Sequence, residues 1–297
     1  MEITKTAIIS VVGRPNVGKS TLTNQLVGRK VAIVSNKPQT TRTRITGLLN
    51  KDGCQYVFLD TPGLHKPRSR LGDFMVKVVE DTVSEVDAAA LVVEPIAHVG
   101  APEESLISQI KAAGIPAVLI INKVDTVKNE ELLAVIAAYA SLHEFDAVVP
   151  VSAKTGKNLD VLLAEFDKFA LDGPQLFPDD MVSDQPEKQV AAEVIREKML
   201  LLLEREVPHG VAVGIEKMET RPDGLTEIHA TIYCEKASHK GIIIGKGGAM
   251  LKKIGELARR DLERDLGCKV YLNLWIKVKE DWRNNQYQMR NFGYQDE

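Results

Sequence analysis

The sequence predicts two domains, a doubly wound α/β domain followed by a smaller α+β domain. Residues 7 to 170 alternate short apolar runs with amphipathic stretches, which is typical of strands and helices that follow one another in a layered sheet. Residues 173–186 contain the Pro, Gly and Asp residues that are common in linkers. At about 150 residues per domain, a chain of 297 residues is long enough for two. We therefore expect the first domain at 1–172, a linker at 173–186 and the second domain at 187–297.

Six apolar runs in the first domain are expected to be strands: Ala7–Gly13, Ile45–Asn50, Tyr56–Asp60, Ala88–Val93, Ala117–Asn122 and Ala147–Val151. Helical patterns lie between several of them, for example at Glu103–Ala113 and Glu130–Leu142. Continuous β-branched and aliphatic runs suit strands that are buried on both faces, which favours a mainly parallel sheet. Ligands of such a sheet bind at the carboxyl ends of the strands, so polar residues at those ends indicate function.

The first strand end matches G-x-x-x-x-G-K-[ST] at Gly13–Ser20, between a predicted strand and a predicted helix. Glycines let backbone N–H groups turn toward anionic oxygens, and the positive end of the helix dipole favours the same ligand. Lys19 would reach the outer phosphates, and the hydroxyl of Ser20 suits Mg²⁺. The residues expected to bind nucleotide phosphates are Gly13, Arg14, Pro15, Asn16, Val17, Gly18, Lys19, Ser20 and Thr21.

A second strand end contributes Asp60, Thr61, Pro62 and Gly63 to the same expected site. Asp60 can hold Mg²⁺ through water, and the N–H of Gly63 can meet the terminal phosphate. Between the two elements, Pro38–Thr43 is polar and has neither helical nor strand periodicity. Such a loop can become ordered around phosphate and Mg²⁺ through a threonine hydroxyl. Thr41 is the candidate for that role and Thr40 a near equal, so the expected Mg²⁺ ligands are Ser20, Thr41 and Asp60.

The third and fourth strand ends indicate which base is bound. Asp125, in the motif Asn122-Lys123-Val124-Asp125, can accept hydrogen bonds from both the ring N–H and the exocyclic amine of guanine. Adenine has no such donor pair, and a site built on these bonds can discriminate by about 10⁴ to 10⁵. The fourth strand is followed by Ser152, Ala153 and Lys154, which can offer an N–H to the guanine oxygen and a side chain along the ring. Four elements in this order predict a GTP-binding domain.

The second domain shows a helical pattern at Glu187–Glu206, alternating runs at Val211–Met218 and Thr226–Tyr233, and a last strand at Val270–Val278. Between them, Gly245–Gly248 forms a G-x-x-G loop that opens a basic helix, as in KH domains, which hold four nucleotides of single-stranded nucleic acid. Residues 238–260 include six cationic residues and one Glu, which gives this stretch a net charge of +5. The expected RNA-binding residues are Lys240, Ile244, Gly245, Lys246, Gly247, Gly248, Lys252, Lys253 and Arg259.

The composition agrees with a cytoplasmic protein whose cysteines are reduced. The net charge of −3 argues against nucleic acid binding over the whole surface but allows a local basic face. Cys54, Cys234 and Cys268 have no metal-ligand spacing and are expected to be free thiols. The sequence has no apolar run of about 18 residues and no signal-peptide pattern at its start. Trp275 and Trp282 are expected in the core rather than as base-stacking side chains.

These motifs together closely resemble those of the bacterial Era GTPases, which have a GTPase domain followed by a KH domain. The resemblance extends through the second domain, where it includes Ile195–Lys198, Val207–His209 and Lys279–Arg283. It implies GTP and GDP as ligands, with Mg²⁺, and hydrolysis of GTP. The residues it implies for that reaction are Lys19, Asn16, Thr41, Asp60 and Gly63.

The residue after Gly63 departs from Ras-like enzymes, in which a polar side chain orients the attacking water. Leu64 is apolar and cannot activate water, so the charge of the transition state must be stabilised in another way. Related GTPases hold a potassium ion at the position of Asn16, where a cation could act as an arginine finger does. The alternative is that Asn16 stabilises the loop through an Asx-type hydrogen bond.

The resemblance also implies partners and a cellular role. It predicts binding to small-subunit ribosomal RNA near the 3′ end, assembly of the small ribosomal subunit, and peripheral association with the inner membrane surface. The sequence indicates no obligate protein partner. In the leading interpretation, GTP prepares the KH surface for RNA and hydrolysis releases it. An RNA-binding scaffold with GTP as a structural ligand and a membrane-surface regulator are the alternatives.

Overall fold

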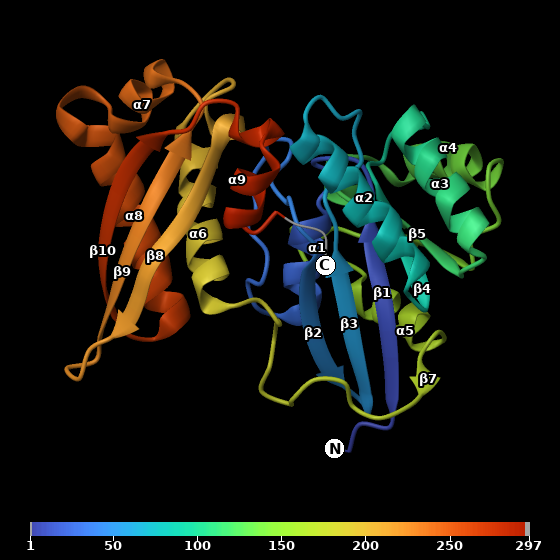
Figure 1. The fold of residues 1–297 in the computed structure, drawn as a ribbon. Coiled ribbons are helices and arrows are strands. Elements are labelled where there is room, and N and C mark those ends of the chain that lie inside the picture. Colours follow the sequence, from blue (N-terminus) through green and yellow to red (C-terminus); the bar gives the residue numbers. More distant parts are fainter. Residues whose placement is uncertain (1, 295–297) are drawn as a thin grey trace. The chain divides into compact units, whose positions relative to one another are not determined.

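The computed structural model describes residues 2–294, and it divides into two compact units (Figure 1). Of the described residues, the first unit comprises 2–67 and 75–184, and the second comprises 68–74 and 185–294. Residues 1 and 295–297, which the predicted domain ranges include, lie outside the described residues. Among residues 2–294, no helix is long and apolar enough to cross a membrane.

The first unit is built on a seven-stranded sheet with the order β2-β3-β1-β4-β5-β6, in which β7 pairs with β1. Neighbouring strands are parallel except for two pairs, β2 with β3 and β7 with β1. The mainly parallel sheet predicted from the sequence is therefore confirmed. The strands are β1 (Lys5–Val12), β2 (Ile45–Lys51), β3 (Cys54–Asp60), β4 (Ala88–Val93), β5 (Ala117–Ile121), β6 (Ala147–Pro150) and β7 (Leu171–Asp172).

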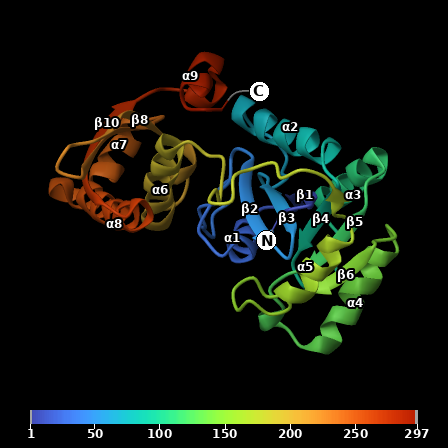
Figure 2. The same cartoon turned by 90° about the horizontal axis from the view of Figure 1, so that it is seen from below.

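Helices cover both faces of this sheet, as Figure 2 shows. On one face, Leu22 of α1 and Phe166 of α5 join the core formed with β1 and β3. On the other face, Val79, Leu106 and Val135 come from α2, α3 and α4. These helices are α1 (Lys19–Val27), α2 (Arg70–Ser84), α3 (Ala101–Ala113), α4 (Asn129–Ala140) and α5 (Leu159–Asp167). Because both faces are buried, the central strands β4 and β5 are apolar along their whole length.

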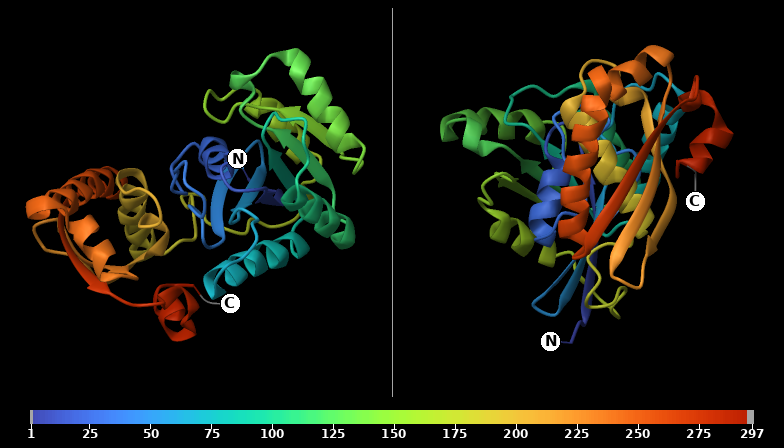
Figure 3. Two further views of the ribbon diagram at one scale, coloured as in Figure 1. Left: turned by 90° about the horizontal axis from the view of Figure 1, so that it is seen from above. Right: turned by 90° about the vertical axis from the view of Figure 1, so that its left-hand side faces the viewer.

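The second unit has a three-stranded sheet with the order β10-β9-β8, in which β9 and β10 are parallel and β8 is antiparallel to β9. Three helices, α6, α7 and α8, pack on one face of it (Figure 3). A short helix near the C-terminus, α9, has its N-terminus capped by Asn285, whose side chain accepts from the N–H of Gln288. The elements are α6 (Glu187–Leu202), β8 (Val211–Thr220), β9 (Leu225–Cys234), α7 (Ala237–Ile244), α8 (Ala249–Leu266), β10 (Lys269–Val278) and α9 (Gln286–Asn291).

Three details differ from the sequence prediction for this unit. The first helix ends at Leu202 rather than Glu206, because Leu203 is already extended. The apolar run before the G-x-x-G loop forms α7, which the strand-like isoleucines did not predict. Trp282 is fully buried as expected, but Trp275 is 42% exposed, so the prediction that it lies in the core is wrong.

The segment predicted as a linker, residues 173–186, is hydrogen-bonded to the first unit through most of its length. The side chain of Gln55 donates to the carbonyl of Phe177 at 2.9 Å. The N–H of Leu48 donates to the carbonyl of Val182 at 3.0 Å. This segment therefore lies along β2 and β3 rather than forming an unattached chain.

Candidate functional site

The loop between β1 and α1 is packed so tightly that two of its glycines have no room for a side chain. A Cβ atom on Gly13 would overlap the carbonyl oxygen of Val92, and one on Gly18 would overlap the side-chain amide of Asn122. Gly18 has φ of 100°, in the left-handed region that favours glycine. The ammonium group of Lys19 donates to the carbonyls of Gly13 at 2.9 Å and Arg14 at 3.0 Å. The loop is thus curled around the side chain of Lys19.

Ser20, Thr41 and Asp60 meet at one point beside this loop. The hydroxyl of Ser20 donates to Oδ2 of Asp60 at 2.6 Å and lies 2.9 Å from the hydroxyl of Thr41. The hydroxyl of Thr40 instead donates to the carbonyl of Lys37. Of the two threonines considered from the sequence, the structure brings Thr41 to Ser20 and Asp60.

The charges in this cluster are buried. Burial lowers the pKa of Lys19 to about 8, and the carboxylate of Asp60 partly offsets the effect. Burial raises the pKa of Asp60 to about 6, against the opposing effects of Lys19, Ser20 and Thr41. The Oδ1 atom of Asp60 has no hydrogen-bond partner among residues 2–294. Buried charges of this kind are stabilised by further ions or hydrogen bonds, which a nucleotide with its metal ion supplies.

The same cluster fits a magnesium ion. Two hydroxyls and one carboxylate are hard oxygen ligands, and Mg²⁺ in nucleotide sites takes few protein ligands together with phosphates and water. Within the described part of the chain, no group of three or more His, Cys, Asp or Glu side chains could hold a metal ion. The structure therefore offers the mixed hydroxyl and carboxylate ligands expected from the sequence, and not an all-protein metal cage.

Residues 61–65 approach the phosphate loop closely. The hydroxyl of Thr61 donates to the carbonyl of Val11 at 2.9 Å. A Cβ atom on Gly63 would lie 2.6 Å from the backbone nitrogen of Pro15, so only glycine allows this approach. The N–H of Leu64 donates to the carbonyl of Gly13, while its side chain is buried in the core. The side chain of Leu64 thus belongs to the apolar core and offers no polar group to the site.

The two base-recognition loops are joined to the phosphate loop by side chains. Asn122 donates to the carbonyl of Val17 at 2.8 Å and accepts from the N–H of Ala153 at 2.9 Å. The hydroxyl of Ser152 donates to Asp125 at 2.7 Å. This bond lowers the pKa of Asp125, which is exposed in the short turn after β5 and is ionised at neutral pH. Lys154 is also exposed.

The strand ends β1, β3, β5 and β6 therefore bring together the residues that the sequence placed in one site. A pocket of about 290 Å³ is lined by Pro15, Asn16, Gly18 and the following residues to Thr21, by much of residues 33–41, and by Gly63 and Lys123. Val17 and Pro62 contribute through buried positions. Asn16 is exposed with φ of 67°.

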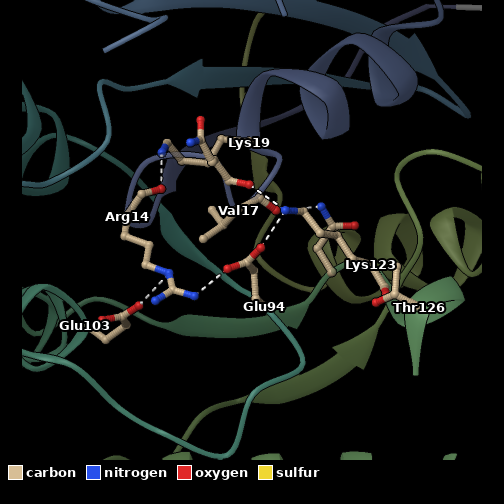
Figure 4. Close-up of polar contacts among 9 residues, drawn as sticks. Arg14, Val17, Lys19, Glu94, Glu103, Lys123 and Thr126 are labelled. Atoms are coloured by element: carbon tan, nitrogen blue, oxygen red, sulfur yellow. Dashed lines mark hydrogen bonds and ion pairs between the residues drawn. The ribbon is translucent and has the colours of Figure 1, made fainter. Parts of the chain in front are cut away.

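An ion-pair network that the sequence analysis did not identify lies behind the phosphate loop (Figure 4). Glu94 follows β4 and forms ion pairs with Arg14 and, at 2.5 Å, with Lys123. Arg14 also lies 3.4 Å from Glu103, which is buried at the start of α3. The ammonium of Lys123 donates in addition to the carbonyl of Asn16 at 2.7 Å. Burial alone would raise the pKa of Glu94, but Lys123 and Arg14 lower it below the ordinary value.

Glu94 could have been found from the sequence. It is the first polar residue after a fully buried strand, which is the same signal that identified Asp60 and Asn122. Because it pairs with one residue of the phosphate loop and one of the base loop, its carboxylate joins the two parts of the nucleotide site.

In the second unit, the G-x-x-G loop forms the turn between α7 and α8. Gly245, Gly247 and Gly248 all have φ between 59° and 81°, which favours glycine. A Cβ atom on Gly245 would lie 2.7 Å from that of Met250, whereas Gly247 and Gly248 face open space. Lys246, between Gly245 and Gly247, is exposed. The loop thus presents backbone and one cation to solvent.

A groove of about 570 Å³ runs beside this loop, between α8 and β10. Gly255 of α8 lies close to Leu274 of β10, because a Cβ atom on Gly255 would lie 3.5 Å from Cδ1 of Leu274. Among the predicted RNA-binding residues, Gly248, Lys252 and Arg259 line the groove. Those that lie outside its lining are Lys240 and Ile244 on α7, Gly245, Lys246 and Gly247 in the loop, and Lys253 on the exposed side of α8.

We expect Glu94→Gln to weaken guanine nucleotide binding about tenfold, because a hydrogen bond to a charged group contributes about 1.5–3 kcal/mol. The Gln side chain keeps the shape but loses the charge that holds Lys123 and Arg14. Titration with a fluorescent GDP analogue measures the change.

The matched control is Glu165→Gln. The side chain of Glu165 is 23% exposed, which matches the 24% of Glu94. It also forms an ion pair, with Lys168 at 2.6 Å, but this pair lies at the end of α5. Equal GDP affinities of the two variants would contradict a role for Glu94 in nucleotide binding.

Comparison with known proteins agrees with this geometry. Residues 8–123 match the family of 50S ribosome-binding GTPases, and residues 206–283 match the KH domain family. Among solved structures, a variant of Aquifex aeolicus Era bound to GDP and AlF4⁻ is similar, with a TM-score of 0.94 and 38% identity. Era in complex with MgGDPNP and nucleotides 1506–1542 of 16S ribosomal RNA gives a TM-score of 0.95 and 38% identity. Each similarity covers 98% of this chain and 99% of the other.

Curated relatives are similar along their whole length. GTPase Era of Alkaliphilus metalliredigens is 48% identical over 292 residues, which is 98% of this chain and 99% of that protein. GTPase Era of Ruminiclostridium cellulolyticum is 51% identical over 290 residues, or 98% of this chain and 97% of that protein. Identity of this degree over two complete domains leaves one assignment: the chain belongs to the family of Era GTPases.

Proposed function

We propose that this protein is a GTP-hydrolysing switch that binds single-stranded small-subunit ribosomal RNA near its 3′ end and acts in assembly of the small ribosomal subunit. The observation that supports it best is the presence in one chain of a guanine nucleotide site and a G-x-x-G loop with its groove. The similarity to Era in complex with MgGDPNP and 16S ribosomal RNA supports the same ligands here. A cytoplasmic location, with peripheral contact to the inner membrane surface, is part of the proposal and rests on the family resemblance.

In this proposal the nucleotide is bound by parts with separate tasks. The phosphate loop and Lys19 bind the phosphates, while Asp125 accepts the two donors of guanine. Ser20, Thr41 and Asp60 would hold Mg²⁺, which neutralises developing phosphate charge when it is bound. The N–H of Gly63 is assigned to the terminal phosphate, because its close approach to Pro15 puts it beside the phosphate loop.

Hydrolysis without a partner is expected to be slow in this scheme. The buried side chain of Leu64 cannot orient water. Ras-like enzymes that lack their arginine finger turn over at roughly 10⁻⁴ s⁻¹, and we expect a similar unassisted rate. Asn16 is exposed in the phosphate loop and is assigned to a monovalent cation, which would add positive charge to the transition state.

For the second unit, we assign the groove and the G-x-x-G loop to the sugar–phosphate backbone of RNA. Lys252 and Arg259 contribute charge inside the groove, and Lys246 contributes it at the loop. If GTP were only a structural ligand, RNA affinity would be the same in the GTP- and GDP-bound forms. A difference between the two affinities, measured on one preparation, supports the switch.

We expect Asp125→Asn to weaken GTP binding by about 100-fold, because two hydrogen bonds to a carboxylate are lost at about 1.5–3 kcal/mol each. The same change should favour xanthosine triphosphate, whose ring has a carbonyl in place of the exocyclic amine. Competition between the two nucleotides measures the selectivity, with Asp160→Asn as the exposed control. An unchanged preference for GTP would remove Asp125 from base recognition.

Potassium should accelerate GTP turnover more than sodium does at equal concentration. Asn16→Ala should abolish the difference between the two salts and leave the rate in sodium within about twofold, since the residue acts only through the larger cation. Phosphate release is measured in both salts for both proteins. Equal rates of the parent protein in the two salts would exclude the cation from the mechanism.

A double substitution, Lys246→Asp with Gly247→Asp, tests RNA binding by the loop. Lys246 is exposed and a Cβ on Gly247 meets no atom within 4 Å, so both side chains have room, although Asp at the φ of 59° of Gly247 costs about 1–2 kcal/mol of backbone strain. Each carboxylate near a phosphate costs about 1–4 kcal/mol at 4 Å, so single-stranded RNA affinity should fall at least tenfold.

GTP binding by the same variant should be unchanged, which shows that the first unit is folded. Lys188→Asp, an exposed lysine at the start of α6, is the control for charge. A folded double variant that binds RNA with parental affinity would refute the KH assignment and the ribosomal function.

A further inference from the structure

The three-stranded sheet of the second unit has two faces with different surroundings. In β9, Ile228, Ala230 and Ile232 are buried in the core that α6, α7 and α8 cover. Side chains alternate along a strand, so the residues between them face the other side of the sheet. Tyr233 of β9 is one of these outer residues, and its ring centroid lies 4.6 Å from that of Phe292. Phe292 therefore covers one end of the outer face.

Three aromatic side chains lie together farther along the outer face. We call His229, Tyr271 and Trp275 the aromatic patch. His229 pairs in register with Asn273, midway between Tyr271 and Trp275 on β10. Its ring centroid lies 6.3 Å from that of Tyr271 and 5.4 Å from that of Trp275. Tyr271 is 48% exposed and Trp275 is 42% exposed. Exposed apolar residues are ordinary when scattered, but contiguous rings mark an interaction surface.

The aromatic patch is continuous with the groove. Tyr271 belongs to both, because it lines the groove together with Gly248, Lys252 and Arg259. It lies on β10, which is an edge strand of the sheet. A chain that leaves the groove across β10 therefore meets the aromatic patch, with Tyr271 as the shared contact.

Ionic groups around the aromatic patch are paired. The carboxylate of Glu227 is hydrogen-bonded to three neighbours, His229, Lys217 and Arg221. The carboxylate of Glu216 pairs with Lys277 at 3.4 Å and accepts from the hydroxyl of Thr231. The surface thus offers flat rings and nearly balanced charge, in contrast to the cationic groove.

We propose that the aromatic patch stacks bases of the single-stranded RNA whose backbone the groove binds. The inference rests on the proposed function of the groove and extends it to the outer face of the sheet. Stacking on exposed aromatic side chains accepts any base and needs no excess charge, and sheet-borne aromatics serve this purpose in other RNA-binding folds. A protein partner packed on the same rings is the competing occupant, and the experiment distinguishes the two.

The first measurement compares RNA lengths. A strand of about four nucleotides is what a G-x-x-G loop holds, and one of about twelve extends beyond it. Both are taken from the 3′ end of small-subunit ribosomal RNA. Trp275→Ala should weaken binding of the longer strand at least fivefold and that of the shorter strand less than twofold, whereas Trp275→Phe should retain most of the affinity.

The control is Tyr287→Ala, which removes an exposed aromatic side chain from α9 and should not alter either affinity. Salt dependence supplies a second criterion. Because the aromatic patch contributes stacking and not phosphate contacts, Trp275→Ala should leave the slope of log affinity against log salt unchanged. Lys252→Ala, in the groove, should make that slope shallower.

Tryptophan fluorescence reports the contact directly. The chain has two tryptophans, and Trp282 is fully buried, so iodide in solution quenches Trp275. The longer RNA should protect Trp275 from iodide and the shorter one should not.

If Trp275 stays open to iodide with both RNAs, or if Trp275→Ala binds the longer RNA as tightly as the parent, the proposal is overturned and the rings belong to another partner. Parental RNA binding by the Lys246→Asp, Gly247→Asp variant would instead refute the groove itself. The two failures are therefore distinguishable.

Discussion

One buried carboxamide holds the nucleotide site of the first unit together. Asn122 is 2% exposed, and its two polar atoms bond to the phosphate loop at Val17 and to the last base loop at Ala153. Gly18 is required for this arrangement, because any side chain there would overlap the same carboxamide. Loss of one partner would leave a buried polar atom unsatisfied, which costs about 1–3 kcal/mol. Phosphate and base recognition are therefore parts of one rigid arrangement rather than two independent contacts.

Charge is distributed around this arrangement in two ways. Lys19 and Asp60 are buried, and burial disfavours the charged form of each, as the opposite shifts of their pKa values show. Glu94 and Lys123 are partly exposed and paired, so their charges persist with water nearby. The buried pair is suited to receive an anionic ligand and a cation, since each can stabilise a charge that the protein alone does not. The exposed pair is suited to keep two loops in place.

Much of this could be predicted from the sequence, because the carboxyl ends of parallel strands must meet at one edge of the sheet. That rule predicts Asp60 and Asn122 as site residues, and it applies equally to Glu94, which directly follows β4. The helix α7 was not predicted because its residues were included in the loop before α8, although Ile243 is buried in the core as in an amphipathic helix. The expectation that Trp275 lies in the core does not take account of its position in the strand. The alternation along β10, which puts it on the outer face with Tyr271, was the stronger signal.

The last segment of the first unit is hydrogen-bonded to β2, the strand that follows Thr41 in the chain. Thr41 contacts Ser20, and β2 begins four residues later at Ile45. The next residue, Thr46, donates from its hydroxyl to Asp184 at 2.9 Å, just before the second unit begins at Gln185. A displacement of Thr41 would thus pass along one short stretch of backbone to the end of the first unit. β2 is an edge strand of the sheet, and the bond from the N–H of Leu48 to the carbonyl of Val182 joins its outer edge to the same segment.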